Sequence, residues 1–174
     1  MMNCNARCWE DNINLQFGDY MLKTAKSIAE LDYAQLLNVY VEHLFSSGSY
    51  GSESVFYDDL SDFLAAPEHI CCLWAPEGRY KACVRVEPHR DGVLLTCLET
   101  APECRRQGYG LSLVAATLQF LIQKDCRSAY VHVAKKNSPS IALHRKIGFY
   151  TISDSARLVD GTVSQNYITM KIDL

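Results

Sequence analysis

The feature of this sequence that most constrains its fold is a strand, a helix and a second strand that follow one another between residues 93 and 134. Residues 93–100 and 129–134 have the short apolar or alternating pattern of strands. Between them, apolar residues recur at helical spacing from 109 to about 124. A strand, helix and strand in succession favour a right-handed crossover with the two strands parallel. The sequence therefore predicts an α/β fold that contains one parallel β-α-β unit.

Helices and hairpins are predicted around this unit. Asp32 is a candidate cap for the first helix, and Ser138, followed by proline, is a candidate cap for the last, which should stop at Gly148. Hairpins favour antiparallel pairing. We therefore predict a mixed, mostly antiparallel central sheet flanked by about four helices. The further predicted elements are helices at 32–45 and 53–65, a break at 46–52, strands at 70–75 and 80–86 around a turn at 76–78, and strands near 149–158 and 165–172 joined through Asp160-Gly161.

Length and charge limit the number of domains and the classes of partner. The 174 residues suit one domain, which we place at 19–174, with 1–18 as an N-terminal arm or an extra edge element. With 17 Lys+Arg against 20 Asp+Glu, the net charge is −3, which argues against nucleic acid as a partner. The longest apolar stretch, 111–122, is shorter than the ~20 residues that span a bilayer, so no membrane partner is predicted.

Eight cysteines are enough to form disulfides, but their positions favour free thiols in a reducing compartment. No C-x-x-C pair is present, so neither a zinc site nor a thioredoxin-like motif is predicted. The start of the chain lacks the apolar segment of a secretory signal. We therefore predict a cytoplasmic protein with free thiols and no metal. Four cysteines lie in apolar or amphipathic segments and are expected to be small buried side chains: Cys71, Cys83, Cys97 and Cys126.

A phosphate-binding turn is predicted between residues 98 and 111. A strand ends there, Arg105 and Arg106 follow, and Gly108 and Gly110 open a helix. Helix starts carry unpaired N–H groups and partial positive charge, which suit an anion. A P-loop would need Lys after the last glycine, and a dinucleotide fingerprint would need glycine where Leu113 stands. Taken alone, the two glycines are also typical of a turn that caps an ordinary helix.

Two motifs in the same order resemble the GNAT superfamily of N-acetyltransferases. Arg105-x-x-Gly108-x-Gly110 after a strand is similar to the family's acyl-CoA pyrophosphate motif. The segment from Asn137 to Phe149 is similar to the family's later helix and strand. The resemblance covers residues from about 30 to 172. It implies an acyltransferase that moves an acetyl group from acetyl-CoA to a primary amine of a small molecule or peptide, by direct attack in a ternary complex.

The resemblance also implies a set of cofactor-binding residues. The loop and helix start would surround the CoA pyrophosphate through backbone amides, and the preceding strand would pair its backbone with the pantetheine arm. Asn137 either contacts the cofactor or is a turn residue before its helix, and Ser140 is a candidate of the same kind. The implied residues are Leu98, Thr100, Arg105, Arg106, Gln107, Gly108, Tyr109, Gly110, Leu111, Asn137 and Ser140.

Two residues are catalytic candidates. His144 stands where many relatives carry a Tyr near the CoA sulfur, so the resemblance implies a general acid, although a lone helical His is often a packed residue. Glu99, at the end of the central strand, is the nearest carboxylate that would serve as a base, with Glu87 and His89 behind it. Cys97 and Cys104 have no evident base partner, which argues against a covalent acyl-enzyme.

Other interpretations stay open at this point. A domain of this fold that binds acyl-CoA without turnover, as a sensor, is the main alternative, and a nucleotide-binding domain is another. The acceptor is not determined, although Asp58, Asp59 and Asp62 are placed either to attract a cationic amine or to form a solvated helix face. A homodimer is possible, as it is common in the family.

Overall fold

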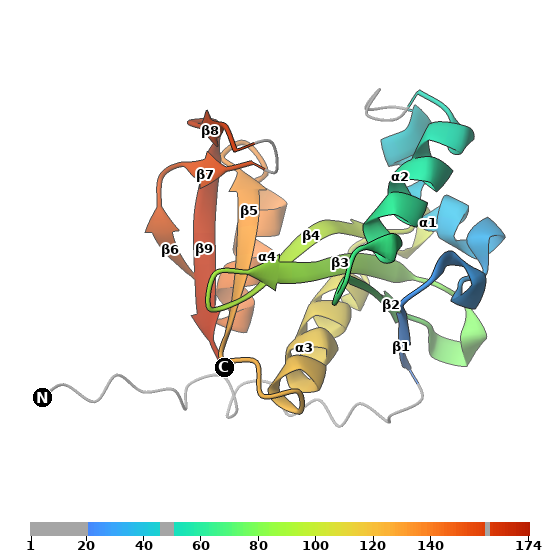
Figure 1. Ribbon diagram of the computed structural model, residues 1–174, viewed down its shortest axis with the longest axis horizontal. Coiled ribbons are helices and arrows are strands. Elements are labelled where there is room, and N and C mark those ends of the chain that lie inside the picture. Colours follow the sequence, from blue (N-terminus) through green and yellow to red (C-terminus); the bar gives the residue numbers. More distant parts are fainter. Residues whose placement is uncertain (1–20, 46–50, 159–160) are drawn as a thin grey trace, which may run out of the picture. The chain divides into compact units, whose positions relative to one another are not determined.

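The computed structural model describes residues 21–45, 51–158 and 161–174 (Figure 1). Within this part of the chain there are four α-helices: α1 (Tyr33–Phe45), α2 (Glu53–Ala65), α3 (Tyr109–Ile122) and α4 (Ser138–Ile147). The arm or edge element expected at 1–18 lies outside the described residues, as do 46–50 of the expected break and Asp160 of the last turn. None of the described helices combines the length and the apolar character needed to cross a membrane.

The strands of the described residues form a mixed sheet of seven and a separate pair, which confirms the predicted fold class. The order in the sheet is β1-β2-β3-β4-β5-β9-β6. The pairs β1–β2, β2–β3, β5–β9 and β6–β9 are antiparallel, whereas β4 and β5 are parallel. The strands are β1 (Leu22–Ala25), β2 (Ile70–Trp74), β3 (Ala82–His89), β4 (Gly92–Thr100), β5 (Ser128–Ala134), β6 (Tyr150–Ser153) and β9 (Tyr167–Asp173), with β7 (Ala156–Arg157) and β8 (Val163–Ser164) as the pair.

The described chain divides into two compact units. The amino-terminal unit holds the described residues up to Pro88 together with Thr96–Thr117. The carboxy-terminal unit holds His89–Leu95 and the described residues from Leu118 to Leu174. β4 and α3 each contribute residues to both units. The prediction of one domain over 19–174 stays a prediction.

The core of the amino-terminal unit lies between helices α1 and α2 and the strands that begin the sheet. Leu36 and Tyr40 of α1 and Phe56 and Leu60 of α2 are each at most 2% exposed. They belong to one apolar cluster with Leu73 of β2. Each pair on a helix is spaced by four residues, so one face of each helix is buried. Ser52 caps α2, because its side chain accepts a hydrogen bond from the Val55 N–H at 3.3 Å.

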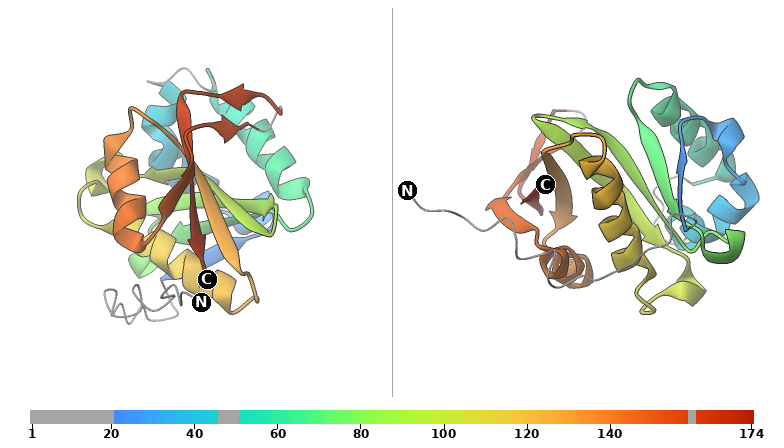
Figure 2. Two further views of the ribbon diagram at one scale, coloured as in Figure 1. Left: turned by 90° about the vertical axis from the view of Figure 1, so that its left-hand side faces the viewer. Right: turned by 90° about the horizontal axis from the view of Figure 1, so that it is seen from below.

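The carboxy-terminal unit is built on the antiparallel pair β5–β9, with β6 on the other side of β9 (Figure 2). Val131 faces Met170 across this pair, and both are buried. The parallel register begins with Val93 opposite Ala129. A Cβ on Gly92 would lie 2.0 Å from the Ser128 carbonyl oxygen, so only glycine allows β4 to start this close to β5.

Several element predictions are wrong in detail. β1 was not predicted, because its four residues show two exposed polar positions and only one fully buried side chain. The single strand expected at 149–158 is divided into β6 and β7, and the β6–β9 register shifts between Thr151 and Ser153. The turn at 76–78 forms a 3-10 helix, as does Pro102–Cys104 in the loop after β4. Cys97 is exposed and Cys126 is half-buried, whereas Cys71 and Cys83 are buried as expected.

Candidate acyl-CoA site

The loop between β4 and α3 is exposed to solvent just before the helix begins. Residues 105–108 are exposed. Gly108 has a φ of +87°, and a Cβ there would meet nothing within 4 Å, so glycine is required for the backbone conformation rather than for space. The Ser112 N–H donates to the Gly108 carbonyl oxygen at 2.9 Å, which begins the helical ladder. The N–H groups of the first turn, from Tyr109 to Leu111, therefore have no acceptor within the helix and are suited to an anion.

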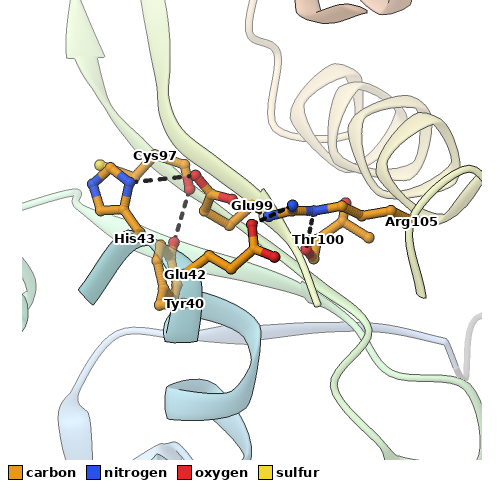
Figure 3. Close-up of polar contacts among 7 residues, drawn as sticks. All are labelled: Tyr40, Glu42, His43, Cys97, Glu99, Thr100 and Arg105. Carbon is orange, nitrogen blue, oxygen red and sulfur yellow. Dashed lines mark hydrogen bonds and ion pairs between the residues drawn. The ribbon is translucent and has the colours of Figure 1, made fainter. Parts of the chain in front are cut away.

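Arg105 ties this loop to α1 and to β4. Its Nε–H donates to the Thr100 carbonyl oxygen at 3.3 Å (Figure 3). One terminal nitrogen pairs with Glu42 of α1, and the other lies 3.8 Å from Glu99 Oε2. Gln107 makes a hydrogen bond within the loop, because its side-chain amide donates to the Glu103 carbonyl oxygen at 2.8 Å. Side-chain contacts thus fix the path of the backbone that leads into α3.

Glu99 lies beside an imidazole. His43 Nδ1 of α1 is 3.6 Å from Glu99 Oε1, and the two side chains are 34% and 25% exposed (Figure 3). Burial raises the pKa of Glu99; Glu42 raises it further, and Arg105 opposes the change. Burial and the positive charge of Arg85 lower the pKa of His43. A carboxylate with a raised pKa next to a neutral imidazole is a pair that can accept a proton.

β4 bends at Cys97, where φ is +50°. A left-handed conformation costs a non-glycine residue about 1–3 kcal/mol and persists where its surroundings hold it. The hydroxyl group of Tyr40 donates to the Cys97 carbonyl oxygen at 2.8 Å (Figure 3). The parallel pairing of β4 with β5 covers Val93–Leu95, just before this bend. The bend therefore lies two residues beyond the last residue of β4 that is paired with β5.

The side chains of α4 have well-defined local roles. The Asn137 side chain accepts a hydrogen bond from the Ser140 N–H at 3.1 Å, so Asn137 is the cap and Ser138 the first helical residue. The cap expected at Ser138 is therefore wrong by one residue, because the amide oxygen of Asn137 reaches the free N–H first. Gly148 ends the helix with a φ of +119°, as predicted.

His144 is buried on α4. It is 3% exposed, and its ring packs edge-on against Phe149 with 5.2 Å between centroids. Nδ1 lies 2.8 Å from the Ser140 carbonyl oxygen, and this contact needs a proton on Nδ1. Burial lowers the pKa of His144, against the effect of the Ser140 carbonyl. The neutral ring that results carries its lone pair on Nε2.

Comparison with known proteins decides the family. A model of the acetyltransferase (GNAT) family matches residues 33–149, which is more than half of the chain. The chain belongs to the GNAT family. No match was found among curated proteins.

Solved structures share the GNAT fold at low identity. A ribosomal-protein-alanine N-acetyltransferase from Brucella melitensis has a TM-score of 0.66 and 18% identity, covering 88% of this chain and 99% of its own. An aminoglycoside 6'-acetyltransferase type Ii has a TM-score of 0.67 and 15% identity, with coverages of 88% and 96%. PaiA N-acetyltransferase from Thermoplasma acidophilum, solved in complex with coenzyme A, has a TM-score of 0.59 and 13% identity, with coverages of 88% and 99%.

The predicted site residues of this GNAT protein fall into two groups, one in each unit. The amino-terminal unit brings together Glu99, the β4 residues Leu98 and Thr100, and the loop and helix start at 105–111. The carboxy-terminal unit brings together Asn137, Ser140 and His144 within α4 and its cap. In the described residues, no group of three or more His, Cys, Asp or Glu side chains is arranged to hold a metal ion.

Sequence reasoning missed the residues that α1 contributes. Tyr40 fits the apolar spacing of the helix expected at 32–45, and neither Glu42 nor His43 belongs to a motif. Their partners Cys97, Glu99 and Arg105 lie 56 to 63 residues away in sequence, so no local pattern connects them.

The acidic face of α2 also has a partner that sequence reasoning missed. Asp59 pairs with Arg85 of β3 at 2.6 Å, and Arg85 is 4% exposed and lies over the ring of Phe63. Asp59 therefore already balances a buried cation of the same unit.

Proposed function

We propose that this GNAT protein transfers an acetyl group from acetyl-CoA to the primary amine of a small molecule or peptide. The observation that carries the proposal is the exposed loop just before α3, where Gly108 turns the chain and leads into first-turn N–H groups that have no acceptor within the helix. A diphosphate supplies the oxygens that such groups bind. PaiA, whose fold is similar, was solved with coenzyme A.

The pantetheine arm would follow β4. Its amides can pair with the strand backbone at Leu98 and Thr100, which lies beyond the β5-paired residues Val93–Leu95. The Thr100 carbonyl oxygen already accepts from Arg105, so the other backbone groups of this stretch would carry the pairing. Backbone amides of 105–111 would hold the diphosphate. Asn137 and Ser140 remain candidates for the same cofactor.

Glu99 would act as the base. It would take a proton from the acceptor's ammonium group, and the neutral amine would then attack the thioester carbonyl carbon. The C–N bond forms as the C–S bond breaks, and the electron pair leaves with the CoA sulfur. The attacking nitrogen then gives up a second proton, which balances the one that the thiolate takes up. The raised pKa of Glu99 brings the carboxylate closer to the working pH of a base, and His43 lies next to it.

His144 would protonate the departing thiolate. Because its Nδ1–H is bonded to the Ser140 carbonyl, the transferred proton would have to come from Nε2 of a ring that had first been protonated. The buried position and lowered pKa of His144 favour the second candidate function, a domain that binds acyl-CoA without efficient turnover.

The acceptor, the oligomeric state and the location belong to the same proposal. The similar structures carry the names of a protein-alanine and an aminoglycoside acetyltransferase, so both peptide and small-molecule amines are reasonable acceptors. The described cysteines are free, which agrees with a cytoplasmic protein. A homodimer would be compatible with the family.

An amine panel tests the proposal. Wild-type protein is incubated with acetyl-CoA and amino acids, peptides, polyamines or aminoglycosides, and CoA thiol release is followed. Amine-dependent release supports acetyl transfer. Binding of acetyl-CoA without release under any amine supports the sensor function, whereas stabilisation by ATP or NAD but not by acetyl-CoA contradicts both.

A further inference from the structure

A buried hydroxyl group holds the bend of β4. The phenol of Tyr40, on α1, donates to the carbonyl oxygen of Cys97 at 2.8 Å, and Cys97 has the left-handed φ of +50° (Figure 3). Tyr40 is 2% exposed, and its ring packs at 5.0 Å from that of Phe56. The donor is therefore fixed by the core of the amino-terminal unit rather than by a flexible side chain.

The chemistry of Tyr40 is more specific than core packing requires. A phenylalanine would fill nearly the same volume, whereas a buried hydroxyl group destabilises the fold unless it is hydrogen-bonded. Burial raises the pKa of Tyr40 well above its usual value, so the phenol keeps its proton and remains a donor. The protonated hydroxyl group of Tyr40 can therefore donate to the Cys97 carbonyl, which belongs to a residue outside normal strand geometry.

α1 contacts β4 again one helical turn later. His43 lies beside Glu99, two residues beyond Cys97. Leu98 lies between these two contacts, and its backbone belongs to the stretch that the proposed function assigns to the pantetheine arm and the thioester. The contacts from α1 thus fix the strand on either side of Leu98.

We propose that Tyr40 is a positioning residue for acyl transfer, which holds the Cys97–Leu98 peptide so that the backbone of Leu98 to Thr100 is set for the thioester before the substrate arrives. This inference rests on the proposed function. Tyr40 acts through the strand and does not touch the reacting atoms. A preset N–H donor stabilises the negative charge that builds on the carbonyl oxygen as the amine adds and the thiolate leaves.

Tyr40→Phe tests the role, with Tyr33→Phe as its matched control. Tyr33 also lies on α1 and donates to a backbone carbonyl, that of Glu53 at 3.0 Å, outside the proposed site. We expect Tyr40→Phe to lower kcat about 10- to 100-fold with little change in KM for acetyl-CoA. Tyr33→Phe should leave kcat unchanged. The urea concentration at the midpoint of unfolding, measured for both variants, shows whether a loss of activity comes from a loss of folding.

Two further measurements separate positioning from a merely structural role. Hydrogen exchange of the amides at 97–100 should be faster in Tyr40→Phe than in wild type, and unchanged there in Tyr33→Phe. Adding Cys97→Gly to Tyr40→Phe should restore part of kcat, because glycine adopts a positive φ without support. Should Tyr40→Phe fail to fold, Cys97→Val replaces it, since a β-branched residue resists this φ and should lower kcat in the same way.

The outcomes are distinguishable. Equal kcat in Tyr40→Phe and Tyr33→Phe, or unchanged kcat in Cys97→Val, overturns the role of Tyr40 alone. A wild-type protein that neither binds acetyl-CoA nor releases CoA overturns the proposed function and this inference with it.

Discussion

Glu99 stands among charges that act on its pKa in opposite directions. Burial and Glu42 raise the pKa of this carboxyl group, and Arg105 lowers it. Arg105 is shared between Glu42 and Glu99, and its side chain is 43% exposed, so these ion pairs contribute little to stability. The charges of Glu42 and Arg105 matter instead because they shift the pKa of Glu99, the proposed base.

We expect Glu99→Gln to lower kcat by about 100-fold or more, because it removes the proton acceptor. Acetyl-CoA affinity, measured by calorimetry, should be unchanged. Glu42→Gln should lower the pKa of Glu99, since one raising charge is lost, and should therefore move the acid limb of the kcat profile to lower pH. An unmoved limb, or a full kcat in Glu99→Gln, would remove Glu99 as the base.

His144→Phe should lower kcat more than it weakens CoA binding if the imidazole protonates the thiolate. Phenylalanine keeps an aromatic ring next to Phe149 but has no titratable nitrogen. Steady-state kinetics and CoA titration give the two quantities separately. A kcat equal to that of wild type would leave His144 with a packing role only.

At the scale of the elements, two substitutions at the start of α4 show which residue caps the helix. Asn137→Ala should destabilise the protein by about 1 kcal/mol, because the Ser140 N–H loses its acceptor. Ser138→Ala is the control, since Ser138 is the first helical residue and its change should cost a few tenths of a kcal/mol at most. Urea unfolding measures both. The reverse order would move the cap to Ser138, where the sequence pattern alone places it.

Local sequence signals predict the elements where neighbouring residues decide the structure. α2 was predicted over 53–65 and forms over these residues, because Ser52 caps it and its apolar residues follow helical spacing. The β-α-β unit was predicted for the same reason, and its parallel register is confirmed. β1 was missed because it is short and half polar, so that its pairing with β2 stabilises it more than its own residues do.

In the candidate site, too, the features set by neighbouring residues could be predicted, and the contacts between distant residues could not. The turn at Gly108 follows from glycines before a helix, which is a local pattern. The contacts of Tyr40 with Cys97 and of His43 with Glu99 depend on how α1 packs on β4, and each joins residues 56 or more apart. The spacing of residues along the sequence does not indicate such contacts. The bend at Cys97 is equally hidden, because a cysteine in the sequence does not indicate a positive φ.

At the scale of the whole molecule, half-buried histidines connect stability to pH. In the carboxy-terminal unit, His89 and His132 lie with 5.7 Å between ring centroids. Burial lowers the pKa of both; His89 lowers that of His132 further, and Arg90 lowers both. The unfolded chain then binds protons more readily than the folded one. Their contribution to stability is complete above the unfolded pKa of about 6.5 and is lost as the pH falls below it.

His132→Asn should therefore reduce the loss of unfolding free energy between pH 7.5 and pH 5.5. Urea unfolding at the two pH values measures it, with wild type as the reference. The raised pKa values of Glu87 and Glu99 act in the opposite direction and are present in both proteins, so the difference isolates the histidine. An identical pH dependence in the two proteins would contradict this account.

Calorimetric titration of acetyl-CoA into three proteins tests most directly whether the start of α3 binds a diphosphate. Gly108 and Gly161 both have left-handed φ values, +87° and +82°, and a Cβ on either would meet nothing within 4 Å. Alanine should therefore strain both backbones similarly, by about 1 kcal/mol. We predict that wild type and Gly161→Ala bind acetyl-CoA alike and that Gly108→Ala binds at least about tenfold more weakly, because its loop amides are displaced. Equal affinity in all three proteins, or no binding by wild type, would contradict the site.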